Sequence, residues 1–121
     1  MKTATVLSLI TIATFANATA PMDDSSYMVL MESVTRQNAL ERSLTDPAAS
    51  PAHVQADLEM FAMRVARVEL SHPGSPCGKT LGMSLTRWWA ARRDRGQIAA
   101  AEQLQRLTAA RTACAASLKK S

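Results

Sequence analysis

The sequence has few aromatic residues and few residues that break helices. Its 121 residues include two tryptophans, one tyrosine and two phenylalanines, with only four glycines and five prolines. All of the glycines and prolines except Gly82 lie between segments of helical periodicity or at their ends. Alanine, in contrast, is abundant. We expect an all-α fold with small, closely packed helix contacts.

Catalytic side chains are also scarce. His53 and His72 are the only histidines, and neither stands in an arrangement that would activate a serine or cysteine nucleophile. No pair of carboxylates lies on an apolar helix face. We therefore expect a protein that is not an enzyme and that carries no cofactor.

The segment from Gly74 to Thr80 resembles the end of a phosphate-binding loop. Gly74 and Gly78, however, enclose three residues where such a loop has four, and the segment follows a helix rather than a strand. Pro76 also removes one of the backbone donors that would hold a phosphate. The sequence therefore argues against a nucleotide site.

The first twenty residues have the pattern of an export signal. Lys2 precedes an uncharged apolar run over 4–15, and small residues follow over 16–20. The run is shorter than the ~20 apolar residues that span a bilayer. We predict that 1–18 is a cleaved signal peptide, with cleavage after Ala20 as the alternative. The mature protein would then lie in the periplasm or be secreted, and no later segment is apolar enough to span a membrane.

The two cysteines, Cys77 and Cys114, are predicted to form a disulfide, as an even number of cysteines in an exported protein suggests. A metal site or a redox-active pair is a weaker alternative, because neither cysteine has a nearby histidine or a Cys-x-x-Cys partner. Cys77 lies 18 residues before Arg95, and Cys114 lies 18 residues after Gly96. Two antiparallel helices that turn at Arg95 and Gly96 would therefore bring the cysteines together.

Helical periodicity predicts four helices. They are expected from the Asp23–Ser26 cap to about Ser43, from the Ser50–Pro51 cap to His72, from about Pro76 to Arg95, and from Gln97 to about Lys119. The apolar residues at helical spacing are, in order, Tyr27, Leu30, Met31 and Val34; Val54, Leu58, Phe61, Val65 and Val68; Leu81, Leu85 and Trp88; and Ala100, Leu104, Leu107, Cys114 and Leu118. The expected architecture is a small bundle of three to four helices in one compact domain. Residues 21–74 form a helical pair, and 75–121 form a disulfide-stapled antiparallel hairpin.

A second apolar face is expected on the helix that follows Ser50. It consists of Ala56, Met63, Ala66 and Leu70. A helix that is apolar on two sides is covered on both, either inside the monomer or by a partner.

The segment from Cys77 to Cys114 resembles the core of the YqjC-like family of small periplasmic proteins. The matching features are Cys77, Ala91, the Gly96 turn, Ile98, Leu104, the Ala110–Arg111 pair and Cys114. The resemblance covers about 38 of the 121 residues. It implies a signal peptide and a disulfide-stapled helical hairpin, and it implies no activity, because the family is functionally uncharacterised. The chain departs from the family in its extra helical region before Cys77 and in the Trp88–Trp89 pair.

Charge is distributed unevenly along the chain. Residues 19–76 have four arginines against eight carboxylates, a net of −4, whereas 77–121 have nine lysines and arginines against two carboxylates, a net of +7. One interpretation is that the two halves pack together with complementary charge. The other is that the basic hairpin binds an anionic partner.

The densest basic segment is the candidate site for such a partner. Trp88 lies on the predicted core face, whereas Trp89 is either exposed or buried at an edge. An unknown envelope protein is the expected partner, with an anionic lipid or glycan as the alternative, and export argues against nucleic acid. The predicted partner-binding residues are Arg87, Trp89, Arg92, Arg93 and Arg95.

Arg111 and the methionines raise two further hypotheses. Arg111 lies on the apolar stripe of the last helix, where it either extends from the edge of the stripe into water or pairs with a carboxylate of the first two helices. Two Met-x-x-Met pairs place thioethers on one helix face each, an arrangement that can bind Cu(I) or Ag(I). These pairs are Met28 with Met31 and Met60 with Met63. Methionine is more often core filler or an adaptable interface.

Taken together, these features predict an exported, non-catalytic binding, adaptor or inhibitor-type protein that acts through a helical surface. The alternatives are a soft-metal binding protein that uses the methionine pairs and an envelope lipid-binding or stress protein.

Overall fold

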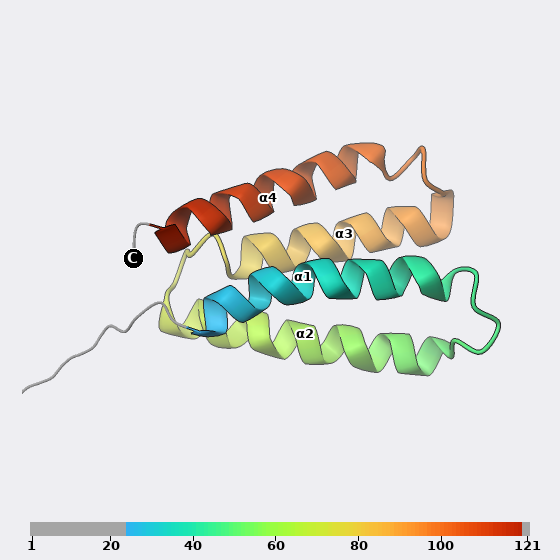
Figure 1. Ribbon diagram of the computed structural model, residues 1–121, viewed down its shortest axis with the longest axis horizontal. Helices are drawn as coiled ribbons and strands as arrows, with labels where there is room; N and C mark the ends of the chain where they lie inside the picture. The colour runs from blue at the N-terminus through green and yellow to red at the C-terminus, as the bar shows by residue number, and fades with distance from the viewer. Residues whose placement is uncertain (1–23, 120–121) are drawn as a thin grey trace, which may run out of the picture.

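The computed structural model describes residues 24–119, and the predicted signal peptide lies outside this range. The described residues form four helices (Figure 1): α1 (Asp24–Ser43), α2 (Pro51–Ser71), α3 (Lys79–Arg95) and α4 (Ala101–Lys119). No strand occurs among them. The fold is therefore the predicted small all-α bundle.

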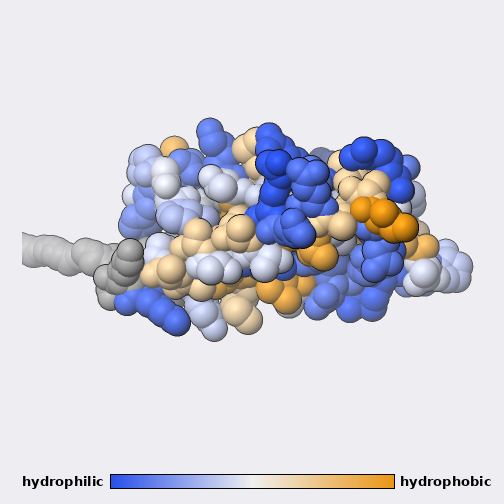
Figure 2. Space-filling view, turned by 90° about the horizontal axis from the view of Figure 1, so that it is seen from above, coloured by the Kyte–Doolittle hydropathy of each residue, from blue (hydrophilic) through white to orange (hydrophobic). Residues whose placement is uncertain are grey.

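The helices form two antiparallel hairpins packed against each other. α1 pairs with α2 and α3 pairs with α4, while α1 and α3 also contact each other at the centre of the bundle. α2 and α4 lie on opposite sides of this central pair (Figure 1). The α1–α2 and α3–α4 connections lie at one end, and the α2–α3 connection lies at the other. Seen from the α4 side, hydrophilic and hydrophobic residues are interspersed (Figure 2).

The core confirms most of the predicted apolar faces. On α2, Phe61, Val65 and Val68 are buried, and Val54 and Leu58 pack against them. Ser50 caps this helix by accepting a hydrogen bond from the His53 backbone N–H, with Pro51 at the first helical position, as predicted. On α3, the buried residues are Leu81, Gly82, Leu85, Trp88, Trp89 and Ala91.

Of the four apolar residues predicted at helical spacing on α1, only Leu30 packs against the core. Tyr27 is 56 % exposed, Met31 47 % and Val34 39 %. The buried residues of α1 are instead Ser26, Val29, Ser33 and Leu40. Small serines allow the neighbouring helices to approach, and the Ser33 hydroxyl is satisfied by donating to the Leu30 carbonyl at 2.7 Å.

The second apolar face of α2 is not covered within the monomer. Met63 is 67 % exposed and Leu70 84 %, and Ala56 and Ala66 are also exposed. Among residues 24–119, only α1 and α3 contact α2, so no described helix lies against its outer side. Of the two expected coverings, the described helices do not supply the one inside the monomer, and cover by a partner stays a prediction.

Two helices begin later than predicted. α3 begins at Lys79 rather than Pro76, because Ser75 to Gly78 form a separate turn in which the Gly78 N–H donates to the Ser75 carbonyl at 3.0 Å. α4 begins at Ala101 rather than Gln97, after a turn over 97–100. Gly96 ends α3 with φ of +93°, a backbone conformation that favours glycine.

The stripe of α4 is confirmed except at Leu104. Ala100, Leu107 and Cys114 are buried, whereas Leu104 is 40 % exposed. Ala110, three residues after Leu107, is buried and was not predicted.

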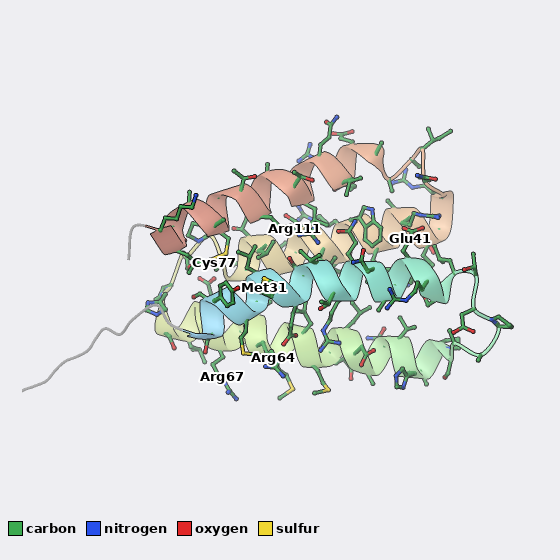
Figure 3. The ribbon with its side chains drawn as sticks, in the orientation of Figure 1. Met31, Glu41, Arg64, Arg67, Cys77 and Arg111 are labelled. Atoms are coloured by element: carbon green, nitrogen blue, oxygen red, sulfur yellow. A yellow bond between two sulfur atoms is a disulfide. The ribbon has the colours of Figure 1, made fainter. Side chains whose placement is uncertain are left out.

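The predicted disulfide joins Cys77 and Cys114, whose Cα atoms are 4.7 Å apart. Both cysteines are fully buried, at the end of the bundle opposite the α3–α4 turn (Figure 3). The bond therefore staples the open end of the hairpin. No helix within residues 24–119 is long and apolar enough to cross a membrane.

Candidate functional site

The five predicted partner-binding residues all lie on α3, but the fold separates them. Arg87 and Arg95 are exposed and form no ion pair with any described residue. Arg92 is bound to α1. Trp89 and Arg93 are brought together, with the Arg93 guanidinium 5.9 Å from the centre of the Trp89 ring.

Trp89 is not an exposed ring. Only 5 % of its surface is accessible, and its ring centre lies 6.1 Å from that of Trp88, which is buried as predicted. Trp89 can therefore act only as the wall of a site and not as an anchor that projects into a partner.

Arg92 has a structural role. Its Nε donates to both carboxylate oxygens of Glu41, at 3.1 Å and 3.0 Å, and its Nη2 also donates to Oε2. This is the single ion pair within residues 24–119 that joins the acidic half of the chain to the basic half. Charge complementarity between the halves thus includes this ion pair, which ties the end of α3 to the end of α1, and the attraction between Glu69 and Lys79.

Trp89 and Arg93 line a hollow of about 300 Å³ against the α1–α2 connection. The other walls include Leu44, Pro51 and Val54. We refer to this hollow and its five residues as the loop-end site. It lies at the end of the bundle that holds the α1–α2 and α3–α4 connections (Figure 1), opposite the end at which Figure 3 labels Cys77.

The charge of Arg93 is held at the rim of the loop-end site. Its Nε and Nη2 donate to the Asp94 carboxylate at 2.8 Å and 3.1 Å. This hydrogen bond lowers the pKa of Asp94 and raises the pKa of Arg93, so both groups are ionised. Because both side chains are more than half exposed, the pair is weak, and a carboxylate from another molecule could replace Asp94.

A second hollow, of about 460 Å³, lies on the other side of Val54, between α1 and α2. It contains charges of both signs, including Arg36, Arg42, His53 and Asp57. Arg36 is already shared between Glu32 at 3.3 Å and Asp57 at 3.5 Å. This hollow therefore has no net preference for an anionic or a cationic ligand.

Arg111 has an unexpected partner. Its Nε donates to the Ser33 hydroxyl at 2.9 Å and its Nη2 donates to the Ser33 carbonyl at 2.6 Å, between α4 and α1 (Figure 3). The side chain is partly buried, and this burial lowers its pKa. No described carboxylate lies within ion-pairing distance, so the hypothesis of a carboxylate partner is wrong. The guanidinium is also bound to protein rather than extended freely into water.

The segment that resembles a phosphate-binding loop binds a carboxylate of its own chain. Glu69 accepts hydrogen bonds from the backbone N–H groups of Gly74 at 2.7 Å and Lys79 at 3.0 Å. These bonds lower the pKa of Glu69. A Cβ on Gly78 would lie 2.5 Å from Glu69 Oε1, so a larger residue there would displace this carboxylate. Sequence reasoning missed this contact, and the only available signal was a glutamate at the end of a helix before a glycine-rich turn.

The four methionines of the soft-metal hypothesis lie at the surface. Met28 is 42 % exposed, Met31 47 %, Met60 52 % and Met63 67 %. The described residues contain no cluster of three or more histidine, cysteine, aspartate or glutamate side chains that could hold a metal ion.

No protein-family model, curated protein or solved structure matches the chain. The resemblance to the YqjC-like family accordingly stays a prediction that rests on the residues between Cys77 and Cys114.

Proposed function

We propose that the protein is an exported, non-catalytic binding protein of the periplasm that holds another envelope protein at the loop-end site. The observation that carries this proposal is the position of Arg93 over Trp89 at the rim of a hollow of about 300 Å³. Arginine and tryptophan are among the residues enriched in the energetic centres of protein interfaces, which lie in well-packed pockets.

The chemistry of the site indicates what the partner presents. An apolar side chain would enter the hollow against Leu44, Val54 and Trp89, and a neighbouring carboxylate would reach Arg93. The exposed Arg87 and Arg95 add positive charge on the same helix and would speed association with an acidic partner. Such a protein would act as an adaptor or as an inhibitor that blocks an envelope enzyme.

The proposal is tested by affinity capture from the envelope extract of the source organism, with the oxidised mature protein as bait. Arg93→Glu and Leu44→Glu should each remove the captured protein, because one reverses the rim charge and the other places a charge in the hollow. Arg106→Glu is the matched control, since Arg106 is an exposed arginine on α4 that bonds only to Glu102. A partner that Arg93→Glu retains, or that Arg106→Glu loses equally, would contradict the proposal.

Arg92 is excluded from this test for a structural reason. Its replacement by glutamate would place two carboxylates together at the position of the Arg92–Glu41 ion pair and destabilise the bundle. A loss of binding in that variant would not distinguish a lost contact from a lost fold.

A further inference from the structure

The outer face of α2 is an apolar surface without a partner in the monomer. It consists of Ala62, Met63, Ala66 and Leu70, all of which are exposed. Leu70 is the most exposed large apolar residue of α2, at 84 %. Met83 of α3, at 42 %, continues this surface across the groove between the two helices.

Two adjoining hollows lie along this groove. One has a volume of about 260 Å³ and is lined by Leu58, Phe61, Ala62 and Met83, among others. The other, of about 470 Å³, is lined by Ala66, Leu70 and Lys79 together with residues it shares with the first. A cavity of ~150 Å³ already accommodates benzene, so the first hollow has room for a leucine side chain.

The same surface carries charges of both signs. Glu59 of α2 is exposed and accepts a hydrogen bond from the Gln55 side chain at 3.4 Å. Lys79 and Arg87 line the α3 edge of the groove, and neither forms an ion pair with a described residue. A partner that fits this surface therefore presents an apolar side chain, an acidic group near it, and small residues between them.

We propose that this partner is a second copy of the chain, and that the protein forms a two-fold dimer with the α2 helices antiparallel. If the axis passes midway between Ala62 and Ala66, Leu70 of one copy lies opposite Leu58 of the other. This position brings Leu70 to the first hollow. Glu59 then lies opposite Glu69 of the other copy, a pair of like charges that the neighbouring Lys79 must offset. At the axis, Ala62 of each copy meets Ala66 of the other, which permits close approach of the helices.

A two-fold interface must be complementary to itself, and this face meets that condition. Leu58 and Leu70 lie six residues before and after position 64. One rotation therefore places Leu70 of each copy at the hollow beside Leu58 of the other. The contact between Glu59 of one copy and Lys79 of the other likewise occurs twice, once on each side of the axis. The proposal is independent of the loop-end site, which involves the first turn of α2 and the α1–α2 connection.

The test is sedimentation equilibrium of the oxidised mature protein between about 1 µM and about 100 µM. We expect a dimer, and Leu70→Glu should weaken self-association at least about 30-fold, the loss typical of an interface hot spot. Ile98→Glu is the matched control, because Ile98 is 93 % exposed and lies outside the proposed interface. Met63→Glu serves as a second interface variant, and the thermal melt of each variant shows that the fold is kept.

A charge exchange tests the register of the two helices. Glu59→Lys alone and Lys79→Glu alone should each be mostly monomeric. An equimolar mixture of the two should dimerise, because every contact between positions 59 and 79 in the heterodimer then joins opposite charges. A wild-type monomer over the whole concentration range, a Leu70→Glu dimer, assemblies larger than a dimer, or a mixture that stays monomeric would each overturn the proposed dimer.

Discussion

Gly82 lies where α3 comes closest to α2, in the middle of a helix. A Cβ at this position would lie 2.9 Å from both methyl groups of Val65. Gly82→Ala would gain up to ~1 kcal/mol of helix propensity, but overpacking of a closely packed core costs ~1–3 kcal/mol. We expect the steric cost to exceed the gain in helix propensity. Urea denaturation should therefore give a lower free energy of unfolding for Gly82→Ala than for the wild type. Adding Val65→Ala to Gly82→Ala should cost less than Val65→Ala costs alone, and a larger cost would refute the steric explanation.

Ser33 and Arg111 join α1 to α4 across 78 positions of sequence. Ser33→Ala should lower the free energy of unfolding by ~1–2 kcal/mol, because a partly buried guanidinium loses one of its two acceptors. Arg111→Met keeps the aliphatic packing and removes the charge, so it should be close to neutral. Equilibrium urea denaturation of both variants checks the difference. Equal destabilisation by the two substitutions would show that packing, and not the charge, governs this contact.

At the scale of elements, Glu69 links the end of α2 to the start of α3. Hydrogen bonds from the Gly74 and Lys79 backbone lower the pKa of its carboxyl group in the folded protein. Folding therefore favours the ionised form of Glu69. Its contribution to the free energy of unfolding is fully present above the unfolded pKa of ~4.3. It is lost as the pH falls through the lower pKa of the folded protein.

Glu69→Gln should accordingly melt below the wild type at pH 7, and the difference should shrink as the pH falls from about 5 towards 3. Thermal melts of both proteins over this range measure it. Glu102→Gln is a suitable control, because Glu102 is exposed on α4, outside both proposed surfaces, and accepts a hydrogen bond from Arg106 of the same helix. A difference between wild type and Glu69→Gln that does not change with pH would contradict the assignment.

At the scale of the whole molecule, the disulfide closes the α3–α4 hairpin at its open end. Its loop contains 36 residues between the cysteines, and such a closure stabilises a fold by ~3–4 kcal/mol in the chain-entropy model. This is a large share of the net stability of a small domain. We expect the oxidised protein to have no free thiols and to melt at least about 10 °C above the reduced protein.

A thiol titration and paired thermal melts measure these two quantities. The double variant Cys77→Ala/Cys114→Ala is the control for effects of the reductant, and it should melt close to the reduced wild type. Two titratable thiols in protein from the native compartment, or equal melting of the oxidised and reduced forms, would count against the predicted role of the bond.

Much of the fold was predictable because its signals are local in sequence. The Ser50–Pro51 cap, the stop after Ser71 and the glycine at position 96 depend on the backbone chemistry of a few adjacent residues. The core seam of α2 follows from the helical period alone. The position of the disulfide followed from the cysteines lying equally far along the sequence from the Arg95–Gly96 turn. Because helices rise by the same amount per residue, this brings Cys77 and Cys114 side by side. The late starts of α3 and α4 were missed because a tight turn and a first helical turn use similar residues.

The candidate site was only partly predictable, because burial depends on which helices are neighbours. Arg87, Trp89, Arg92, Arg93 and Arg95 form one basic segment in the sequence, but the fold buries Trp89, binds Arg92 to Glu41 and leaves Trp89 and Arg93 together at a hollow. No pattern within the sequence of α3 could reveal that Arg92 forms an ion pair with Glu41, 51 positions away.

The sequence by itself determined the four helices, the cap of α2 and the disulfide, since the backbone and the helical period act within a few residues. Only the tertiary structure decided that α1 buries serines and exposes Tyr27 and Met31, that Arg111 binds Ser33, and that the outer face of α2 stays open. The physical reason is that an apolar face shows only that a helix packs against something. Which helix covers that face depends on how the two hairpins pack against each other.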